Sequence, residues 1–208
     1  GRKKVTKEIY DLKIKNSAEV LYDLNVDVLG LCEVENRKVL NDLNNSYRSR
    51  NYSIIHYDSP DERGIDNALL YDKDKFSIIT SKPIQNNLGR DDKTRDILYV
   101  KGLYKNSALH IFVNHWPSNY GGKELAIPKR KSTALLIMQQ ISEIQKNENN
   151  AEIILLGDFN EDPTDENVTL LYDLGFVSLM EPMIGIPKTG TYLYRGKDYF
   201  YDQIIINK

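Results

Sequence analysis

The stretch "AEIILLGDFNEDP", residues 151–163, decides how this chain folds, because an apolar run there ends abruptly in a polar turn. The run "AEIILL" is too short for a helix of its own and predicts a buried strand. Asp158 and Asn160 follow this run closely. Aspartate and asparagine often close a strand by forming a turn, so this stretch alone leaves open whether they are turn residues or site residues.

The second half of the stretch predicts the start of a helix. Asp162 stands where an N-cap belongs, Pro163 occupies the first helical position and Asp165 the third. Aspartate is a favoured N-cap, and proline is favoured at the first helical position because its missing N–H has no partner there. We therefore expect a helix to begin directly after Asp162.

Composition limits the classes of protein that this chain can belong to. Its 208 residues are enough for one substantial core, so a single domain over residues 1–208 is expected. With 28 basic and 30 acidic residues, the net charge of −2 argues against binding nucleic acid mainly through a broad basic surface. An enzyme that meets phosphate locally through a metal ion remains compatible with this charge. The single cysteine, Cys32, lies in an apolar run and is expected to be a small buried hydrophobe.

Periodicity and turn clusters define the other expected elements. Helices are expected at residues 7–25, 36–45 and 131–146. Strands are expected at residues 26–34, 52–57, 66–72, 75–81, 96–104, 108–116, 151–156, 191–194 and 199–207. Helices do not alternate regularly with strands between residues 51 and 116, which disfavours a simple Rossmann or flavodoxin arrangement. The pattern predicts an α/β (α+β) protein whose helices cover a two-sheet core.

Four polar residues stand at the ends of apolar strands: Glu33, His115, Asp158 and Asp202. One such residue alone is usually a cap or turn former. Four of them favour a site, since strand ends in an α/β core converge on one edge. The three carboxylates offer hard oxygen ligands, which suit Mg²⁺ or Mn²⁺, with Ca²⁺ as a further alternative. Zinc is disfavoured, because the chain has neither HExxH nor CxxC and contains three histidines.

Four segments, in this order along the chain, carry a resemblance to a known family. They are "DVLGLCEVEN" (27–36), "NHWPSN" (114–119), "LLGDFNEDP" (155–163) and "YDQIII" (201–206). Together they resemble the metal-dependent endonuclease/exonuclease/phosphatase superfamily, and in particular its deoxyribonuclease-like and bacterial nuclease-like branch. The resemblance implies a four-layer α/β/β/α sandwich, with two mixed β-sheets packed face to face and the helices outside.

The resemblance also implies roles for the residues at the strand ends. Glu33 and Asp158 match metal-binding positions, and Asp158 also matches the aspartate that activates the attacking water. Asn160 matches the asparagine that holds the phosphate. Asp202 matches an aspartate that orients a catalytic histidine. His115 matches a histidine that stabilises the transition state or the leaving group.

Three further residues are candidates for substrate binding: Arg95, Ser118 and Asn119. Arg95 resembles a phosphate-contacting arginine of the deoxyribonuclease-like branch. A salt bridge from Arg95 to one of three nearby aspartates, Asp91, Asp92 or Asp96, is an equally weighted alternative. The run "PKRK" (128–131) could touch a phosphate backbone, but a solvated helix start is the preferred interpretation.

Two pieces of the family pattern are not found in this sequence. The family's first strand carries an asparagine that contacts the metal shell, and its last strand carries Ser-Asp-His. No "SD" or "DH" dipeptide occurs in these 208 residues. We therefore expect the sequence to be a piece of a longer polypeptide that lacks the first and last strands. A sheet with exposed edges should be of low stability when this stretch is isolated.

The sequence therefore predicts a divalent-metal-dependent phosphodiester hydrolase, with a nuclease preferred. One alternative is a phosphatase, or a phospholipase C-like sphingomyelinase or inositol-phosphate phosphatase, of the same fold. Another is a non-catalytic binding module. The expected partner is nucleic acid or another phosphodiester, and a monomer without a membrane span is expected. Both secreted or periplasmic and cytoplasmic locations are open, and the likeness of "CEVEN" (32–36) to bacterial exported nucleases favours export.

Overall fold

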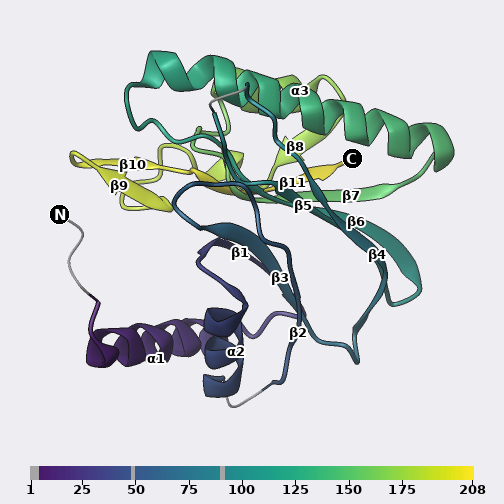
Figure 1. The fold of residues 1–208 in the computed structure, drawn as a ribbon. Helices are drawn as coiled ribbons and strands as arrows, with labels where there is room; N and C mark the ends of the chain where they lie inside the picture. The colour runs from purple at the N-terminus through teal and green to yellow at the C-terminus, as the bar shows by residue number, and fades with distance from the viewer. Residues whose placement is uncertain (1–4, 48–49, 90–91) are drawn as a thin grey trace.

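The computed structural model describes residues 5–47, 50–89 and 92–208 and arranges them in four layers (Figure 1). The larger sheet has the strand order β4-β5-β6-β7-β11-β8 and the smaller sheet the order β1-β3-β2. The strands of the larger sheet are β4 (Phe76–Ile84), β5 (Ile97–Tyr104), β6 (Ser107–His115), β7 (Glu152–Asp158), β8 (Phe176–Ser178) and β11 (Asp202–Asn207). Those of the smaller sheet are β1 (Val28–Val34), β2 (Ser53–His56) and β3 (Asp66–Tyr71). The other elements are α1 (Lys7–Leu24), α2 (Arg37–Ser46), α3 (Lys123–Asn147), α4 (Glu166–Tyr172), the 3₁₀ turn η1 (Glu181–Met183) and a hairpin of β9 (Tyr192–Tyr194) and β10 (Lys197–Tyr199).

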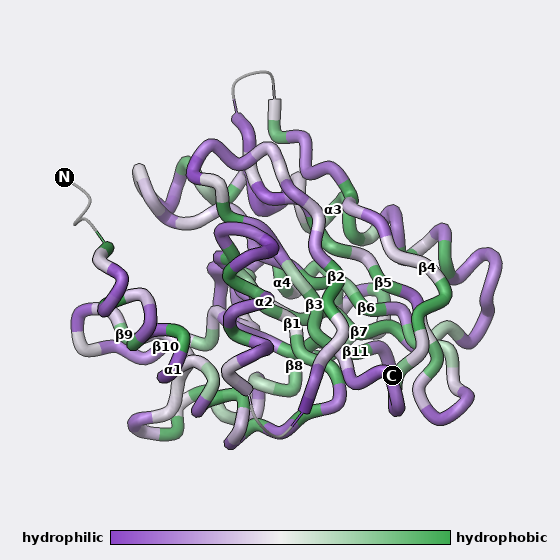
Figure 2. Tube along the Cα trace, turned by 60° about the horizontal axis from the view of Figure 1, so that its bottom comes forward, coloured by the Kyte–Doolittle hydropathy of each residue, from purple (hydrophilic) through white to green (hydrophobic). Residues whose placement is uncertain are grey.

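Three apolar clusters hold the layers together. The first lies between the larger sheet and α3 with α4, and contains Ile137. The second fills the space between the two sheets and contains Val113. The third packs α1 and α2 against the smaller sheet and contains Leu40. In Figure 2 hydrophobic segments follow the central strands, whereas hydrophilic segments form much of the periphery. None of the helices in the described residues is long and apolar enough to cross a bilayer.

The expected two-sheet sandwich with outer helices is confirmed. The larger sheet is mixed, because β6 and β7 run parallel and its other pairs run antiparallel. In the smaller sheet, the described pairs β1-β3 and β2-β3 are both antiparallel. The mixed character expected of both sheets therefore applies only to the larger one. A three-residue strand such as β8 carries too little apolar pattern to be recognised in the sequence.

Two expected helix starts are wrong. The long helix α3 begins at Lys123 rather than Lys131 and contains Pro128 in its second turn, where the sequence favoured a boundary. The helix expected after Asp162 begins at Glu166. Asp162 instead forms a turn, accepting a hydrogen bond from the Asp165 N–H at 2.9 Å through its carbonyl. The Asp162 carboxylate accepts one from the Phe200 N–H at 2.7 Å, so it fixes the approach to β11 rather than a helix.

The β6-α3-β7 crossover decides where the polar strand ends lie. Because β6 and β7 are parallel, both end at the same edge of the larger sheet. The antiparallel strand β11 begins at that edge, next to the end of β7. This arrangement brings three distant parts of the sequence together at one place on the sheet.

Gly157, the glycine of "GDFN", permits a close approach of β7 to β6. Its φ is +123°, and an added Cβ would lie only 2.0 Å from the carbonyl oxygen of Asn114. The obstacle is a backbone atom in the middle of a sheet, which cannot move aside without breaking the ladder. A side chain at this position is therefore excluded by both conformation and space.

We expect Gly157→Ala to lower the free energy of unfolding by about 3 kcal/mol or more, because it combines backbone strain with overpacking. Gly64 is a matched control, since it has a φ of +64° but no atom within 4 Å of an added Cβ. Gly64→Ala should therefore lower the free energy of unfolding by only about 1 kcal/mol. Urea unfolding of both variants measures the difference, and equal losses would contradict the steric account.

Candidate active site

The ends of three neighbouring strands form a row of polar side chains. His115 on β6 is directly opposite Asp158 on β7, and Asp158 is directly opposite Asp202 on β11. All three line one cavity of about 680 Å³. The sequence-predicted residues Glu33, Ser118, Asn119 and Asn160 line the same cavity. The structure therefore brings together every candidate residue except Arg95.

Glu33 reaches this cavity from the smaller sheet. It lies near the end of β1, within an irregularity of the pairing between Leu31 and Val34. Its φ is +60°, a left-handed conformation that strains a residue with a side chain by about 1–3 kcal/mol. The bulge turns the glutamate out of the regular alternation of the strand. The Glu33 carboxylate contributes to raising the pKa of Asp158 across the gap between the sheets.

Asp158 is the central residue of the row. Its side chain is 26% exposed, and one carboxylate oxygen accepts a hydrogen bond from the Asn160 N–H at 2.8 Å. Burial, followed by repulsion from Asp202 and Glu33, raises the pKa of Asp158 to about 7, against the lowering by that hydrogen bond and by Arg95. Without a cation this carboxyl group exchanges its proton near neutral pH, which is the range a general base needs.

His115 is buried and lies beside Asp158. Its Nε2 is 3.6 Å from Asp158 Oδ2, which is too long for a good hydrogen bond. Burial, together with the positive charges of Arg95 and Arg63, lowers the pKa of His115 to about 3. The imidazole is therefore neutral at pH 7, and its contact with Asp158 is not an ion pair. A neutral imidazole can donate a hydrogen bond to an anion but cannot act as a strong proton donor.

Asn160 takes a different conformation from the one that the sequence suggested. The chain does not continue as an extended segment after Asp158, because Asn160 has a left-handed φ of +51°. Its backbone N–H binds the Asp158 carboxylate, and its side-chain Nδ2 donates to the carbonyl of Trp116 at 2.9 Å. The two residues still face one cavity, but a local turn places them there rather than strand alternation.

Arg95 lies behind the row instead of lining the cavity. It is 4% exposed, and its guanidinium donates to the carbonyls of His115 and Trp116 at 3.2 and 2.8 Å. It also pairs with Asp61 at 3.3 Å. The salt bridge considered from the sequence is therefore made to a distant aspartate rather than to Asp96 or Asp92, while Asp91 lies outside the described residues. Arg63, which also pairs with Asp61, faces the cavity in its place.

The buried ion pair of Arg130 and Glu161 braces the loops of the site. Arg130 is 0% exposed, and its Nε lies 2.6 Å from Glu161 Oε1. The guanidinium also donates to the carbonyl of Pro117 and to Asn119 Oδ1, each at 3.0 Å. The solvated "PKRK" interpretation is therefore wrong for Arg130, which ties the loop after β6 to the loop after β7. This pair was not predicted from the sequence, because the residues next to Arg130 and Glu161 in the chain give no indication that the two side chains meet across 31 positions.

Four tyrosines of the β9–β10 hairpin and its exit also line the cavity: Tyr192, Tyr194, Tyr199 and Tyr201. The sequence predicted strands in this region but assigned these side chains no function. Their spacing of two residues on each strand was the available signal, since alternate residues of a strand share a face. Lys123, at the start of α3, is a further cation in the cavity lining.

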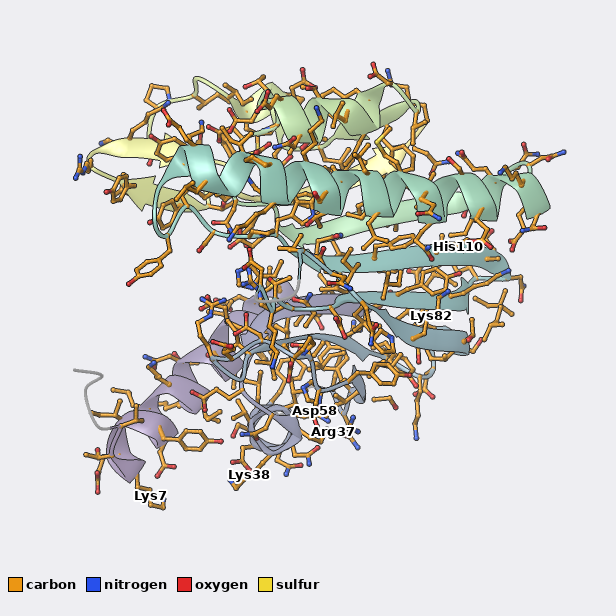
Figure 3. The ribbon with its side chains drawn as sticks, turned by 45° about the horizontal axis from the view of Figure 1, so that its top comes forward. Lys7, Arg37, Lys38, Asp58, Lys82 and His110 are labelled. Atoms are coloured by element: carbon orange, nitrogen blue, oxygen red, sulfur yellow. The ribbon has the colours of Figure 1, made fainter. Side chains whose placement is uncertain are left out.

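The other two histidines lie outside this cavity. His110 is near the opposite end of β6 from His115, in the part of the larger sheet remote from the β9–β10 hairpin (Figure 3). Its ring nitrogens contact the Tyr99 hydroxyl at 2.8 Å and the Glu148 carboxylate at 3.1 Å. These contacts tie β6 to β5 and to the end of α3, which is a structural role.

His56, Asp58 and Asp66 form the one group of three ligand-type side chains, among the described residues, whose donor atoms all lie within 4.8 Å of one another. His56 Nε2 is 2.9 Å from Asp66 Oδ2, and the other Asp66 oxygen accepts from the Ser59 N–H at 2.8 Å. Asp58 appears on the lower side of the molecule in Figure 3. The Asp66 carboxylate already has partners, so internal hydrogen bonding accounts for this group.

The cavity carboxylates suit a divalent cation through their chemistry. Glu33, Asp158 and Asp202 are hard oxygen donors, and their repulsion contributes to the raised pKa of Asp158. Mg²⁺ is usually held by one or two carboxylates and keeps several waters, so it does not need three protein ligands in contact with one another. These residues fit Mg²⁺ or Mn²⁺ better than zinc.

The raised pKa of Asp158 predicts that this carboxylate destabilises the metal-free protein at neutral and higher pH. Its folded-state pKa of about 7 exceeds the value of about 3.9 in an unfolded chain. The folded state therefore holds a proton that the unfolded chain has lost, and stability falls as pH rises from about 4 to 7. Asp158→Asn removes this penalty, so in EDTA at pH 8 its melting temperature should exceed that of the wild type by several degrees.

The gain in melting temperature should shrink at pH 5, where the folded wild-type protein keeps the proton on Asp158. Glu152→Gln, at the exposed opposite end of β7, should have the same melting temperature as the wild type at both pH 8 and pH 5. An Asp158→Asn protein that melts below the wild type at pH 8 in EDTA would contradict the electrostatic account.

Comparisons with known proteins support the fold and identify the family. The structure is similar to a truncated TDP2 from Caenorhabditis elegans, with a TM-score of 0.74 and 20% identity, covering 97% of this chain and 79% of that chain. It is similar to the human Nocturnin catalytic domain with bound sulfate, with a TM-score of 0.70 and 19% identity. That match covers 100% of this chain and 78% of the Nocturnin chain. A mannosyl-6-phosphatase from Bacteroides thetaiotaomicron matches with a TM-score of 0.68 and 17% identity. That match covers 95% of this chain and 77% of the phosphatase chain.

At these identities, likeness to the solved structures shows the fold alone. Curated protein sequences provide no match to this chain. A sequence model described as the Endonuclease/Exonuclease/phosphatase family, by contrast, matches residues 1–208. This match over the whole chain confirms the resemblance carried by "GDFN" and the other three segments. The chain belongs to the endonuclease/exonuclease/phosphatase family.

Proposed function

We propose that this protein is a divalent-metal-dependent phosphodiesterase that acts on nucleic acid. Family membership supports an enzyme of the phosphoesterase or nuclease kind. The observation that carries the finer proposal is the row of His115, Asp158 and Asp202 at one sheet edge, facing Glu33 across a single cavity. A non-catalytic module would have no need to keep a strained glutamate opposite two aspartates.

Glu33 and Asp158, with Asp202 beside them, would hold Mg²⁺ or Mn²⁺. The bound cation supplies Lewis-acid stabilisation of the negative charge that develops on the phosphoryl oxygens. This charge is what limits attack on a phosphodiester, because the equatorial oxygens become more negative in the transition state. The assignment of these ligands rests on their oxygen chemistry and their shared cavity.

The chain's own residues would carry the proton transfer and the positioning. A water oxygen forms a bond to phosphorus, Asp158 accepts the proton of that water, and the bond from phosphorus to the leaving oxygen breaks. The leaving oxygen takes a proton from solvent, since neutral His115 is too weak an acid to supply one at pH 7. His115 and Asn160 act as fixed hydrogen-bond donors to the phosphoryl group, and repulsion from Asp202 contributes to raising the pKa of Asp158 in the metal-free site.

A panel of substrates tests this proposal in the protein that carries residues 1–208. It contains a single-stranded oligonucleotide, supercoiled plasmid, bis(p-nitrophenyl) phosphate and mannose 6-phosphate, each with Mg²⁺ or Mn²⁺. Hydrolysis of the diesters but not of mannose 6-phosphate is expected. Hydrolysis of the monoester alone would overturn the proposal in favour of a phosphatase, and no turnover of any substrate would favour a binding module.

Glu33→Gln should weaken Mn²⁺ binding by at least about tenfold, because even loss of an outer-shell partner weakens metal sites roughly 10–100-fold. Isothermal titration calorimetry with Mn²⁺ measures this effect without reference to turnover. Glu35→Gln is a matched control, since Glu35 is an exposed glutamate two residues further along the chain that does not line the cavity. Equal affinity of wild type and Glu33→Gln would remove Glu33 from the metal site.

A further inference from the structure

The β9–β10 hairpin presents one aromatic face to the catalytic cavity. In its register Tyr192 is opposite Tyr199, and Tyr194 is opposite Lys197. Residues paired in this way share a side of the ribbon, and Tyr201 follows two residues after Tyr199. We call Tyr192, Tyr194, Tyr199 and Tyr201 the tyrosine face. Leu193 and Asp198 are paired with each other on the opposite side of the ribbon.

Three rings of the tyrosine face are nearly parallel, and the fourth, Tyr199, is tilted by 45° against Tyr192 and by 39° against Tyr201. The Tyr192 ring lies 5.2 Å from the Tyr201 ring at an interplanar angle of 17°, and 6.2 Å from the Tyr194 ring at 10°. Tyr192 and Tyr194 are 45% and 47% exposed, so part of each ring remains accessible to a ligand. Nearly parallel rings that are open to a cavity can stack another flat ring against their exposed faces.

Cations accompany these rings. The Arg195 guanidinium lies 5.2 Å from the centre of the Tyr194 ring, and the Lys197 ammonium 4.6 Å from that of Tyr199. Arg63 and Lys123 also line the cavity, together with the carboxylates of Glu33, Asp158 and Asp202. The cations beside the rings are therefore those of Arg195 and Lys197. Aromatic rings interleaved with cations are the combination that binds the bases and phosphates of a single strand.

The tyrosine face is continuous with the catalytic row. Asp202 follows Tyr201 directly, and its backbone N–H donates to Thr191 Oγ1 at 2.9 Å. The Phe159 N–H donates to the carbonyl of Tyr201 at 2.7 Å, so the end of the hairpin is bound to the residue between Asp158 and Asn160. A phosphodiester held at Asp158 would therefore place its neighbouring nucleotide against the tyrosine rings.

We infer that the tyrosine face stacks the unpaired bases next to the scissile phosphate, which makes single-stranded nucleic acid the substrate class. This inference rests on the proposed function, because it assigns the cavity to a nucleic-acid substrate. Bases inside a duplex are already stacked on their neighbours and cannot reach the rings. A sugar ring can also stack on tyrosine, so mannose 6-phosphate is included as a competitor in the test.

Binding of a fluorescein-labelled dT12 oligonucleotide in EDTA, followed by fluorescence anisotropy, tests the inference without any need for turnover. Tyr192→Ala combined with Tyr194→Ala should raise the dissociation constant at least about tenfold, because each stacked base depends on a ring. The matching double change to phenylalanine keeps the rings and should stay within threefold of the wild type. Leu193→Ser, on the opposite side of the hairpin, should bind like the wild type.

A 12-base-pair duplex with the same label should bind at least about tenfold more weakly than dT12. Equal binding of the alanine variant and the wild type, or equal binding of duplex and single strand, would overturn the inference. Displacement of dT12 by mannose 6-phosphate at the same phosphate concentration would assign the face to sugars and also overturn it. Binding of dT12 through the tyrosines without hydrolysis of any diester would refute the proposed function alone, so the two failures are distinguishable.

Discussion

Asp158→Asn is expected to lower kcat for oligonucleotide hydrolysis by about 10²–10⁴-fold, with a much smaller change in KM. Asparagine has nearly the same shape and can still accept the hydrogen bond from the Asn160 N–H, so the loop should keep its conformation. What is lost is the proton acceptor, together with one negatively charged group of the proposed metal site beside Asp202 and Glu33. General-base catalysis contributes about this factor, and it acts in the transition state rather than in binding.

The matched control for this change is Glu152→Gln, at the start of the same strand. Glu152 is exposed and stands six positions before Asp158 on β7, outside the cavity lining. Its replacement should leave kcat within twofold of the wild-type value. An Asp158→Asn enzyme that retains more than a tenth of wild-type kcat would remove Asp158 from the chemistry.

Arg130→Ala and Glu161→Ala should each lower the free energy of unfolding by about 3–5 kcal/mol. Each change leaves a buried charge without its partner, which is far more costly than losing the pair as a whole. Glu161 would lose the Arg130 contact at 2.6 Å, and its remaining bonds to Asn167 cannot neutralise the charge. Arg130 would lose its only carboxylate partner among the described residues while still holding Pro117 and Asn119.

A double change tests this explanation. Arg130→Ala with Glu161→Ala removes both charges together, so its loss of stability should be smaller than the sum of the two single losses by at least about 1 kcal/mol. Lys7→Ala is a surface control, because the Lys7–Asp11 pair on α1 is largely exposed and should contribute at most about 1 kcal/mol. Urea unfolding measures all four proteins, and strictly additive losses would contradict a coupled buried pair.

The polar residues at the strand ends could be predicted from the sequence, because each one lies next to an apolar run in the chain. Asp158, His115 and Asp202 each adjoin an apolar run, and such runs predict strands whose ends meet at a sheet edge. The parallel β6–β7 pair then places them in register. The sequence also predicted Asn160 as a site residue, although it did not predict the left-handed conformation of Asn160. A turn and an extended segment can both bring Asp158 and Asn160 to the same cavity.

The parts of the site that depend on distant partners could not be predicted from the sequence. Arg130 looked like a solvated charge, and its burial follows only from Glu161. Arg95 was expected to bind phosphate or a neighbouring aspartate, but Asp61 is brought to it from 34 positions away. Asp162 has the sequence context of an N-cap, yet its N–H donates to the Asp165 carboxylate and its own carboxylate accepts from the Phe200 N–H. Local patterns therefore identified residues that line the cavity, whereas the contacts that hold the surrounding loops depend on partners distant in the sequence.

The metal dependence of bis(p-nitrophenyl) phosphate hydrolysis decides whether the strand-end row is a metal-assisted phosphodiesterase centre. Wild-type activity should rise with Mg²⁺ or Mn²⁺ to saturation and disappear in EDTA. The activity of Asp158→Asn should stay at least a hundredfold lower at every metal concentration. Hydrolysis that persists in EDTA, or equal metal-activation curves for wild type and Asp158→Asn, would contradict the account.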